Sequence, residues 1–244
     1  MDFERDRQTP FSFACRACGQ CCAGKIIMAG PHEVLGMARL LGMSTTEFLS
    51  RHTDHGGTTL RFGEDGRCSF VTPEGCRVHP RRPLVCRLYP LGRATDGEGG
   101  EKFALFPKES GCKAEFGEDG TIETFLESQG VAPYIEWSRR YGDLYRRMLG
   151  LLERLDVQGK VETGAAGGGG QAESGGGESG REPISSWQDV DASLTEFCAA
   201  NGLAVPGTIE DAIALHLRAI GEWLDGLESR VGEKQKDPQG AKRS

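Results

Sequence analysis

The pattern of apolar and polar positions predicts four helices in the first 155 residues of the chain. Between Pro31 and Gly42, apolar residues recur at helical spacing, and Ser44 to Glu47 form a capping box that begins a second short helix. A third short helix is expected from Thr124. A long amphipathic helix is expected over residues 133–155, and an apolar face is formed by Tyr134, Trp137, Tyr141, Leu144, Met148, Leu151 and Leu155.

A second helical pair is predicted near the end of the chain, over residues 186–201 and 208–231. Thr208 to Asp211 read as the N-terminal cap of the second member. Its buried stripe is expected to be Ile209, Ile213, Leu217, Ile220, Leu224 and Leu227. We interpret Cys198 and His216, which lie in this pair, as packing residues.

Between residues 58 and 107 the pattern changes to short strands and turns. Runs beginning at Thr59, Cys68 and Cys76 are separated by Asp-Gly and Pro-Glu-Gly sequences, which predict β-hairpins. The pentapeptide Phe-Gly-Glu-Asp-Gly occurs at residues 62–66 and again at 116–120, and we interpret both copies as turns. Large apolar residues are scarce here, so this region needs a stabilising cross-link.

Residues 159–182 are rich in Gly, Ser and Glu and predict a flexible tether. We therefore expect a cysteine-rich domain over residues 1–158, a linker over 159–182, a helical pair over 183–232 and a disordered tail over 233–244. The expected fold class is α+β: a small metal-stapled domain with short β-hairpins and flanking helices, followed by the C-terminal helical segment.

Charge is distributed unevenly along the 244 residues. Residues 159–244 contain 8 Lys and Arg against 14 Asp and Glu, and so carry −6 of the net charge of −7. The sequence offers no support for nucleic-acid binding. No stretch approaches the roughly 20 apolar residues of a membrane span, and the charged N-terminus does not resemble a signal peptide.

Cysteine is the residue type that indicates chemistry. Cys15, Cys18, Cys21 and Cys22 fall within eight residues, and overlapping Cys-x-x-Cys steps allow thiolates to converge on one ion. The expected metal ligands are all eight clustered cysteines, namely Cys15, Cys18, Cys21, Cys22, Cys68, Cys76, Cys86 and Cys112. A total of 9 cysteines is odd and argues against a full disulfide framework. A cytoplasmic location, where thiols stay reduced, is expected.

Basic residues accompany the later cysteines. Residues 77–93 contain five arginines and His79 but no acidic residue. We favour a role in offsetting thiolate charge over that of a solvated basic loop. The segment contains Arg77, Arg81, Arg82, Arg87 and Arg93.

The ordered motifs resemble a known family. They are Cys-x-x-Cys-Gly-x-Cys-Cys from Cys15, Cys-Arg-Val-His-Pro from Cys76, and Arg-Pro-Leu-Val-Cys-Arg-Leu-Tyr-Pro from Arg82. Over residues 11–130 the chain is similar to the YkgJ-type, or CxxCxxCC, cysteine-cluster proteins. The resemblance implies a domain that chelates zinc or iron, and some members are labelled iron–sulfur oxidoreductases. Similar proteins include flagellin lysine N-methylases, but no glycine-rich methyl-donor site is recognisable outside the tether.

Two arrangements of the sulfurs remain open. Adjacent residues of an extended chain point to opposite sides, so Cys21 and Cys22 are not expected to serve one ion. In one arrangement, Cys15, Cys18 and Cys21 take a fourth sulfur from the later set, and Cys22 joins the remaining sulfurs in a second site. In the other, one cluster uses four or five sulfurs and the spare thiols are redox partners. His79 could replace one sulfur, and Cys112 has the alternative of being a buried free thiol.

The sequence thus favours a metal-binding protein whose partner is zinc or iron, with an iron–sulfur cluster as one form of the latter. An iron–sulfur oxidoreductase is the alternative, and a lysine N-methylase is a weaker one. The C-terminal helices offer a surface for a protein partner. No catalytic triad, paired carboxylate or phosphate loop indicates another reaction.

Overall fold

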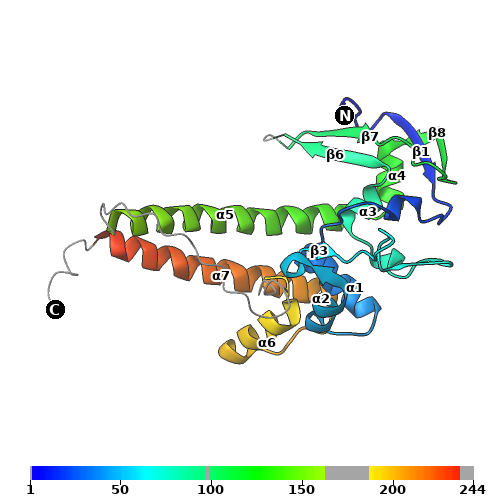
Figure 1. Ribbon diagram of the computed structural model, residues 1–244. Coiled ribbons are helices and arrows are strands. Elements are labelled where there is room, and N and C mark those ends of the chain that lie inside the picture. Colours follow the sequence, from blue (N-terminus) through cyan, green and yellow to red (C-terminus); the bar gives the residue numbers. More distant parts are fainter. Residues whose placement is uncertain (1, 97–98, 163–186, 237–244) are drawn as a thin grey trace, which may run out of the picture. The chain divides into compact units, whose positions relative to one another are not determined.

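A computed structural model describes residues 2–96, 99–162 and 187–236, and this part of the chain has the expected α+β fold (Figure 1). The helices are α1 (Pro31–Leu40), α2 (Thr45–His52), α3 (Leu84–Leu88), α4 (Ile122–Ser128), α5 (Ala132–Glu162), α6 (Val190–Asn201) and α7 (Ile209–Lys236). The strands are β1 (Pro10–Ala14), β2 (Thr53–Asp54), β3 (Thr59–Leu60), β4 (Val71–Thr72), β5 (Gly75–Cys76), β6 (Leu91–Thr95), β7 (Glu101–Leu105) and β8 (Glu115–Thr121). Short 3₁₀ turns are η1 (Gln20–Cys22), η2 (His55–Gly57) and η3 (His79–Arg81).

Two compact units are present: residues 1–138 with 182–193, and residues 139–181 with 194–244. Most of the expected tether and the end of the expected tail lie outside the described residues. Helix α5 continues to Glu162, past the expected end at residue 155, and α7 continues to Lys236, past residue 231. The proposed division into domains stays a prediction. Within the described residues, no helix combines the length and apolarity needed to cross a membrane.

The helices at the start of the first unit form as the sequence predicts. Pro31 begins α1, and Ser44 accepts a hydrogen bond from the Glu47 amide at the start of α2. One core cluster joins these helices to the hairpin region, because Leu60, Phe70 and Val78 are buried with them. Its other buried members are Ala29, Val34, Met37, Ala38, Phe48 and Leu49.

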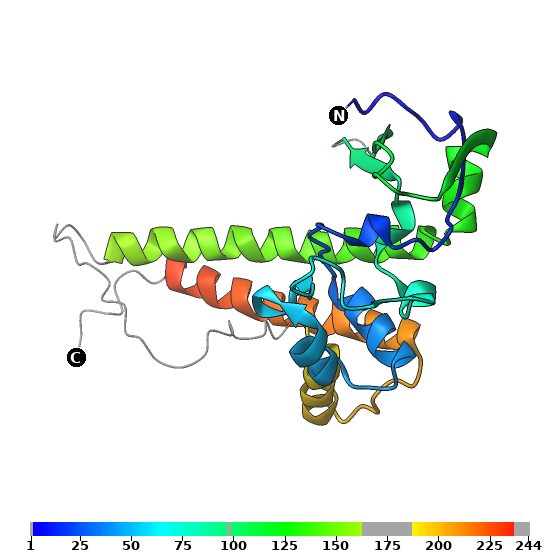
Figure 2. The same cartoon turned by 45° about the vertical axis from the view of Figure 1, so that its right-hand side comes forward.

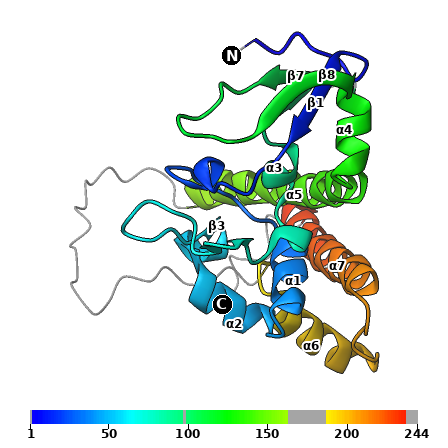
Figure 3. The same cartoon turned by 90° about the vertical axis from the view of Figure 1, so that its right-hand side faces the viewer.

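The strands form four separate antiparallel pairs: β1 with β8, β2 with β3, β4 with β5, and β6 with β7. The first copy of Phe-Gly-Glu-Asp-Gly is a turn, as expected, and Gly66 adopts a φ of +72°. The second copy, residues 116–120, lies inside β8, so its assignment as a turn is wrong. The reason is tertiary pairing: Phe116 lies opposite Phe13 of β1, and Figure 3 shows the two strands side by side.

Residues 188–191 belong to the first unit although they follow the tether in sequence. The Thr45 hydroxyl donates to Asp189 Oδ1 at 2.6 Å, and the Thr45 amide donates to Asp191 Oδ2 at 2.7 Å. Arg39 forms a two-pronged ion pair with Asp191. We call residues 188–191 the return segment, because these contacts hold it on α1 and α2.

In the second unit, α5 and α7 run side by side in the same direction (Figures 1 and 2). Tyr141 of α5 and His216 of α7 share a buried hydrogen bond of 2.8 Å, and Arg147 pairs with Asp225 and Glu228. Cys198 is buried, and its thiol donates to the carbonyl oxygen of Ala204 at 3.7 Å. The predicted packing roles of Cys198 and His216 agree with this burial.

Candidate metal centre

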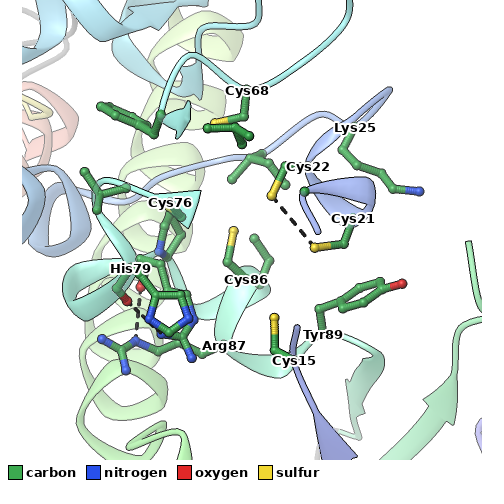
Figure 4. Close-up of a pocket in the computed structure, with 18 of the residues that line it drawn as sticks. Cys15, Cys21, Cys22, Lys25, Cys68, Cys76, His79, Cys86, Arg87 and Tyr89 are labelled. Atoms are coloured by element: carbon green, nitrogen blue, oxygen red, sulfur yellow. Dashed lines mark hydrogen bonds between the residues drawn. The ribbon is translucent and has the colours of Figure 1, made fainter. Parts of the chain in front are cut away.

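A cavity of about 780 Å³ in the first unit is lined by six of the eight clustered cysteines (Figure 4). These six come from four places in the chain. Cys15 follows β1, Cys21 and Cys22 lie in η1, Cys68 and Cys76 flank the β4–β5 hairpin, and Cys86 lies in α3. The fold therefore brings together thiols that are up to about seventy residues apart.

Cys18 and Cys112 are not among the cavity-lining residues, but they face each other. Their Sγ atoms lie 4.0 Å apart, although 94 positions separate them in sequence. The pairing of β1 with β8 brings them together, because β1 ends just before Cys15 and β8 begins just after Cys112. Cys112 is only partly buried, so the alternative of a buried free thiol does not describe it.

The expectation that Cys21 and Cys22 diverge is wrong. Their Sγ atoms lie 3.8 Å apart, because residues 20–22 form a 3₁₀ turn instead of an extended segment. Gly19 precedes this turn with a φ of +71°, a conformation that favours glycine. Adjacent side chains in a turn do not alternate as they do in a strand.

Backbone groups near the cysteines favour the thiolate form in a repeated local pattern. The Ala17 amide donates to Cys15 Sγ at 3.4 Å, and this turn holds Ala17 at a φ of +49°. At four further cysteines, the backbone two residues later acts to lower the pKa of the thiol, which favours the thiolate form. These pairs are Gln20 with Cys18, Phe70 with Cys68, Val78 with Cys76, and Ala114 with Cys112.

The hydrogen bonds of Cys15 and Cys198 differ in direction. Cys15 Sγ accepts an N–H hydrogen bond, whereas Cys198 donates its own S–H to a carbonyl oxygen. A thiolate can only accept hydrogen bonds, and it is the thiolate form that binds metals. The contact of Cys198 is therefore that of a neutral thiol, and the contact of Cys15 is compatible with a thiolate.

Burial opposes ionisation at the deeper cysteines. Burial, followed by the charges of neighbouring Cys68 and Cys76, raises the pKa of Cys86 to about 12. The hydrogen bond shared with Cys22 lowers the pKa of Cys21 to about 7, and the same bond raises that of Cys22. A bound cation would offset the free-energy cost of burying several negatively charged thiolates close together.

Two sulfur pairs are close enough to be neighbouring thiolate ligands, either of one ion or of two adjacent ions. Zinc–sulfur bonds of about 2.3 Å in a tetrahedron place the sulfurs about 3.8 Å apart. The Cys21–Cys22 and Cys18–Cys112 separations of 3.8 and 4.0 Å match this edge. Among the described residues, no three His, Cys, Asp or Glu side chains are close enough together to hold an ion. The donor set fits a thiophilic metal, and binding requires the pairs to converge.

His79 lines the cavity, but its ring is engaged elsewhere. Arg82 Nη1 lies 3.2 Å from His79 Nδ1, and because a guanidinium can only donate, Nδ1 must accept. The neutral ring then carries its proton on Nε2 and has no lone pair left for a metal. Burial, followed by the charges of Arg82 and Arg87, lowers the pKa of His79.

The arginines of residues 77–93 have separate roles. Arg87 is 8% exposed, and it donates to the carbonyl oxygens of Pro80, Arg82 and Gln129 and to the Tyr134 hydroxyl. Arg93 pairs with Glu101 at 2.5 Å. Arg82 lies among the cysteines. Burial and the charge of Arg87 lower its pKa, whereas Cys86, Cys15 and Cys76 act to raise it. Offsetting of thiolate charge is therefore supported for Arg82, and a structural role for Arg87 and Arg93.

Tyr89 is a cavity residue that cysteine spacing does not single out. Its hydroxyl oxygen is buried and makes no hydrogen bond to any described residue. Burial raises the pKa of Tyr89 to about 12, and Cys21 and Cys112 are the next causes. The available signal was its position three residues after Cys86.

Comparison with known proteins identifies the cysteine-rich region. Residues 14–113 match the model of the CxxCxxCC family, described as a "putative zinc- or iron-chelating domain". The match spans all eight clustered cysteines and excludes Cys198. The sequence resemblance to this family is thus confirmed, and metal binding is the property that the match supports. No curated protein and no solved structure matches the chain.

Proposed function

We propose that this protein holds zinc or iron through the thiolates of its clustered cysteines. The observation that carries the proposal is the convergence of six cysteines, from separate places in the chain, on one cavity. The backbone next to four of the clustered cysteines also acts to lower the pKa of the thiol, and so favours the thiolate, which is the form that metals bind.

The main centre is built around Cys22, Cys68, Cys76 and Cys86, which line the cavity. Their charges act on one another: Cys22 is affected by Cys21, Cys86 and Cys68, and Cys86 by Cys68, Cys76 and, less strongly, by Cys21, which precedes Cys22. Four thiolates satisfy tetrahedral zinc, and they also satisfy iron or an iron–sulfur cluster. A bound ion would supply a cross-link between the hairpin, η1 and α3, and bound iron would add an electron carrier.

Iron–sulfur redox chemistry is the second candidate. Four cysteine thiolates are also the usual ligand set of an iron–sulfur cluster, and the cavity of about 780 Å³ has room for a cluster as well as for a single ion. Thiolate ligation of either kind needs reduced cysteines, and so a cytoplasmic location remains part of this proposal.

Anaerobic purification of the full chain, followed by metal analysis and an absorption spectrum, tests the proposal. Bound zinc in a colourless protein supports a zinc centre. A brown protein with acid-labile sulfide and an absorption band at about 400 nm supports iron–sulfur redox chemistry. Cys68→Ser with Cys76→Ser should reduce the metal content, whereas the control Cys198→Ser should not. Wild-type protein without metal, even after reduction and supplementation with zinc and with ferrous iron, would contradict metal binding.

A further inference from the structure

The Cys18–Cys112 pair is not explained by the main centre. Both side chains are partly exposed and lie outside the set of residues that line the cavity. Their sulfurs are nevertheless 4.0 Å apart, close to the tetrahedral edge of about 3.8 Å. The backbone at Gln20 and at Ala114 acts to lower the pKa of Cys18 and Cys112, respectively.

The number of sulfurs limits how many the main centre can use. A tetrahedral ion takes four thiolates, and Cys22, Cys68, Cys76 and Cys86 complete that number. Four clustered cysteines then remain, namely Cys15, Cys18, Cys21 and Cys112. Three of these follow one another at Cys-x-x-Cys spacing, which suits convergence on one ion, and the fourth is already paired with Cys18.

We propose a second metal centre, held by Cys15, Cys18, Cys21 and Cys112. This inference rests on the proposed function, because it assigns a separate zinc or iron ion to the sulfurs that the main centre leaves. Figure 4 shows Cys15 and Cys21 directed into the cavity from the N-terminal segment. They connect the cavity to the Cys18–Cys112 pair, since each lies three residues from Cys18.

The two centres would be neighbours. Cys21 belongs to the second centre and Cys22 to the main one, and their sulfurs lie 3.8 Å apart. Occupation of one centre therefore fixes the η1 turn that carries a ligand of the other, and loading of the two is coupled through it. The Tyr89 hydroxyl has Cys21, Cys112 and Cys18 among its charged neighbours, and it can donate to a thiolate of the second centre.

Zinc content of the full chain provides the first test. We expect two zinc ions per wild-type chain, because eight thiolates satisfy two tetrahedral ions. Cys18→Ser with Cys112→Ser should lose one ion and keep the other, and Cys68→Ser with Cys76→Ser should do the same for the opposite centre. The control Cys198→Ser should keep both. One ion in the wild type, unchanged by Cys18→Ser with Cys112→Ser, would overturn the second centre and leave the proposed function intact.

Thiol alkylation of the wild type avoids dependence on variants that fail to fold. The zinc-loaded and zinc-free proteins are treated with iodoacetamide under reducing conditions, and each cysteine is followed by mass spectrometry. Zinc should slow the alkylation of Cys18 and Cys112 at least about tenfold, together with that of Cys15 and Cys21. If Cys18 and Cys112 react equally fast with and without zinc while Cys68 and Cys76 are protected, the second centre does not exist. If zinc protects none of the eight, the proposed function itself fails.

Discussion

Glu33 of α1 accepts a hydrogen bond from the backbone amide of Leu84, the first residue of α3, at 2.6 Å. Its other carboxylate oxygen accepts from the Gly30 amide at 2.8 Å, and the side chain is almost fully buried. One carboxylate thus satisfies amides at the N-termini of two helices. Because α3 carries Cys86, Glu33 also positions a cysteine that we propose as a ligand of the main centre.

Glu33→Ala should leave both amides without an acceptor. We expect a loss of about 2–4 kcal/mol in the free energy of unfolding, since each bond involves a charged acceptor. Zinc affinity should fall with it. Urea unfolding and zinc competition measure the two effects. Glu47→Ala, which removes an exposed i,i+4 ion pair with Arg51, is the matched control and should cost under about 0.5 kcal/mol. An equal effect of both substitutions would contradict the positioning role.

His32 should make stability depend on pH. Burial lowers its pKa to about 4, from 6.5, so between these values the unfolded chain binds more protons than the folded one. Stability should therefore fall as the pH drops from 6.5 to 4, by on the order of 3 kcal/mol. Burial raises the pKa of neighbouring Glu33, which acts in the opposite direction. The difference between wild type and His32→Gln isolates the histidine, and identical pH profiles would contradict this prediction.

The return segment should stabilise the first unit without holding metal. Asp191→Ala removes the Arg39 ion pair and the acceptor of the Thr45 amide, and should cost about 1–3 kcal/mol. A chain ending at Gln158 should also be less stable, yet still fold and retain zinc. Asp143→Ala, which breaks exposed pairs with Arg139 and Arg146, is the control. The full chain and the chain ending at Gln158 are compared for zinc content. If the full chain holds zinc and the shortened chain does not, the expected cysteine-rich domain over residues 1–158 is wrong.

Removal of the metal should unfold much of the hairpin region. β4 and β5 contain two residues each, and their turn is flanked by Cys68 and Cys76. Structural zinc contributes about 10 kcal/mol or more in small domains, which exceeds the usual stability of a domain. Chelation under reducing conditions, or Cys86→Ser, should therefore reduce amide-exchange protection over residues 58–112, with the largest change between Cys68 and Cys76. Cys198→Ser should leave protection there unchanged.

The buried residues Leu60, Phe70 and Val78 give this experiment a clear alternative outcome. They attach the hairpin region to α1 and α2 by apolar packing. If that packing suffices, protection will persist across residues 58–112 after complete metal removal. The cysteines would then serve chemistry on a scaffold that is stable without them.

The cysteines could be identified from sequence because their residue type and spacing carry the information directly. The sequence left two groupings of the sulfurs open and did not single out Cys112 as the neighbour of Cys18. Cys112 has no partner within thirty positions in either direction except Cys86, and its neighbour Cys18 is reached through the β1–β8 pairing. The 3₁₀ turn at Cys21 and Cys22 depends on the positive φ of Gly19. The expectation of an extended segment did not take this turn into account.

The helices were predictable because their apolar periodicity and capping residues are local. The strands were less so, as the repeated pentapeptide shows. Residues 62–66 close a turn, whereas the identical residues 116–120 extend along β1. The same local sequence adopts two structures because only the second copy has a long strand to pair with. The return segment is similar, since Asp189 and Asp191 find Thr45 across about 145 positions.

The pairing of β1 with β8 has a consequence for how the protein is made. β1 leaves the ribosome before its partner strand, which ends at Thr121. At synthesis rates of about 5–20 residues per second, the first four cysteines wait roughly 5–20 seconds for that strand. During this interval they are exposed on a growing chain, where a wrong metal or an oxidant can reach them first. Correct metallation of this protein thus depends on the cell protecting a nascent chain, as well as on the finished site.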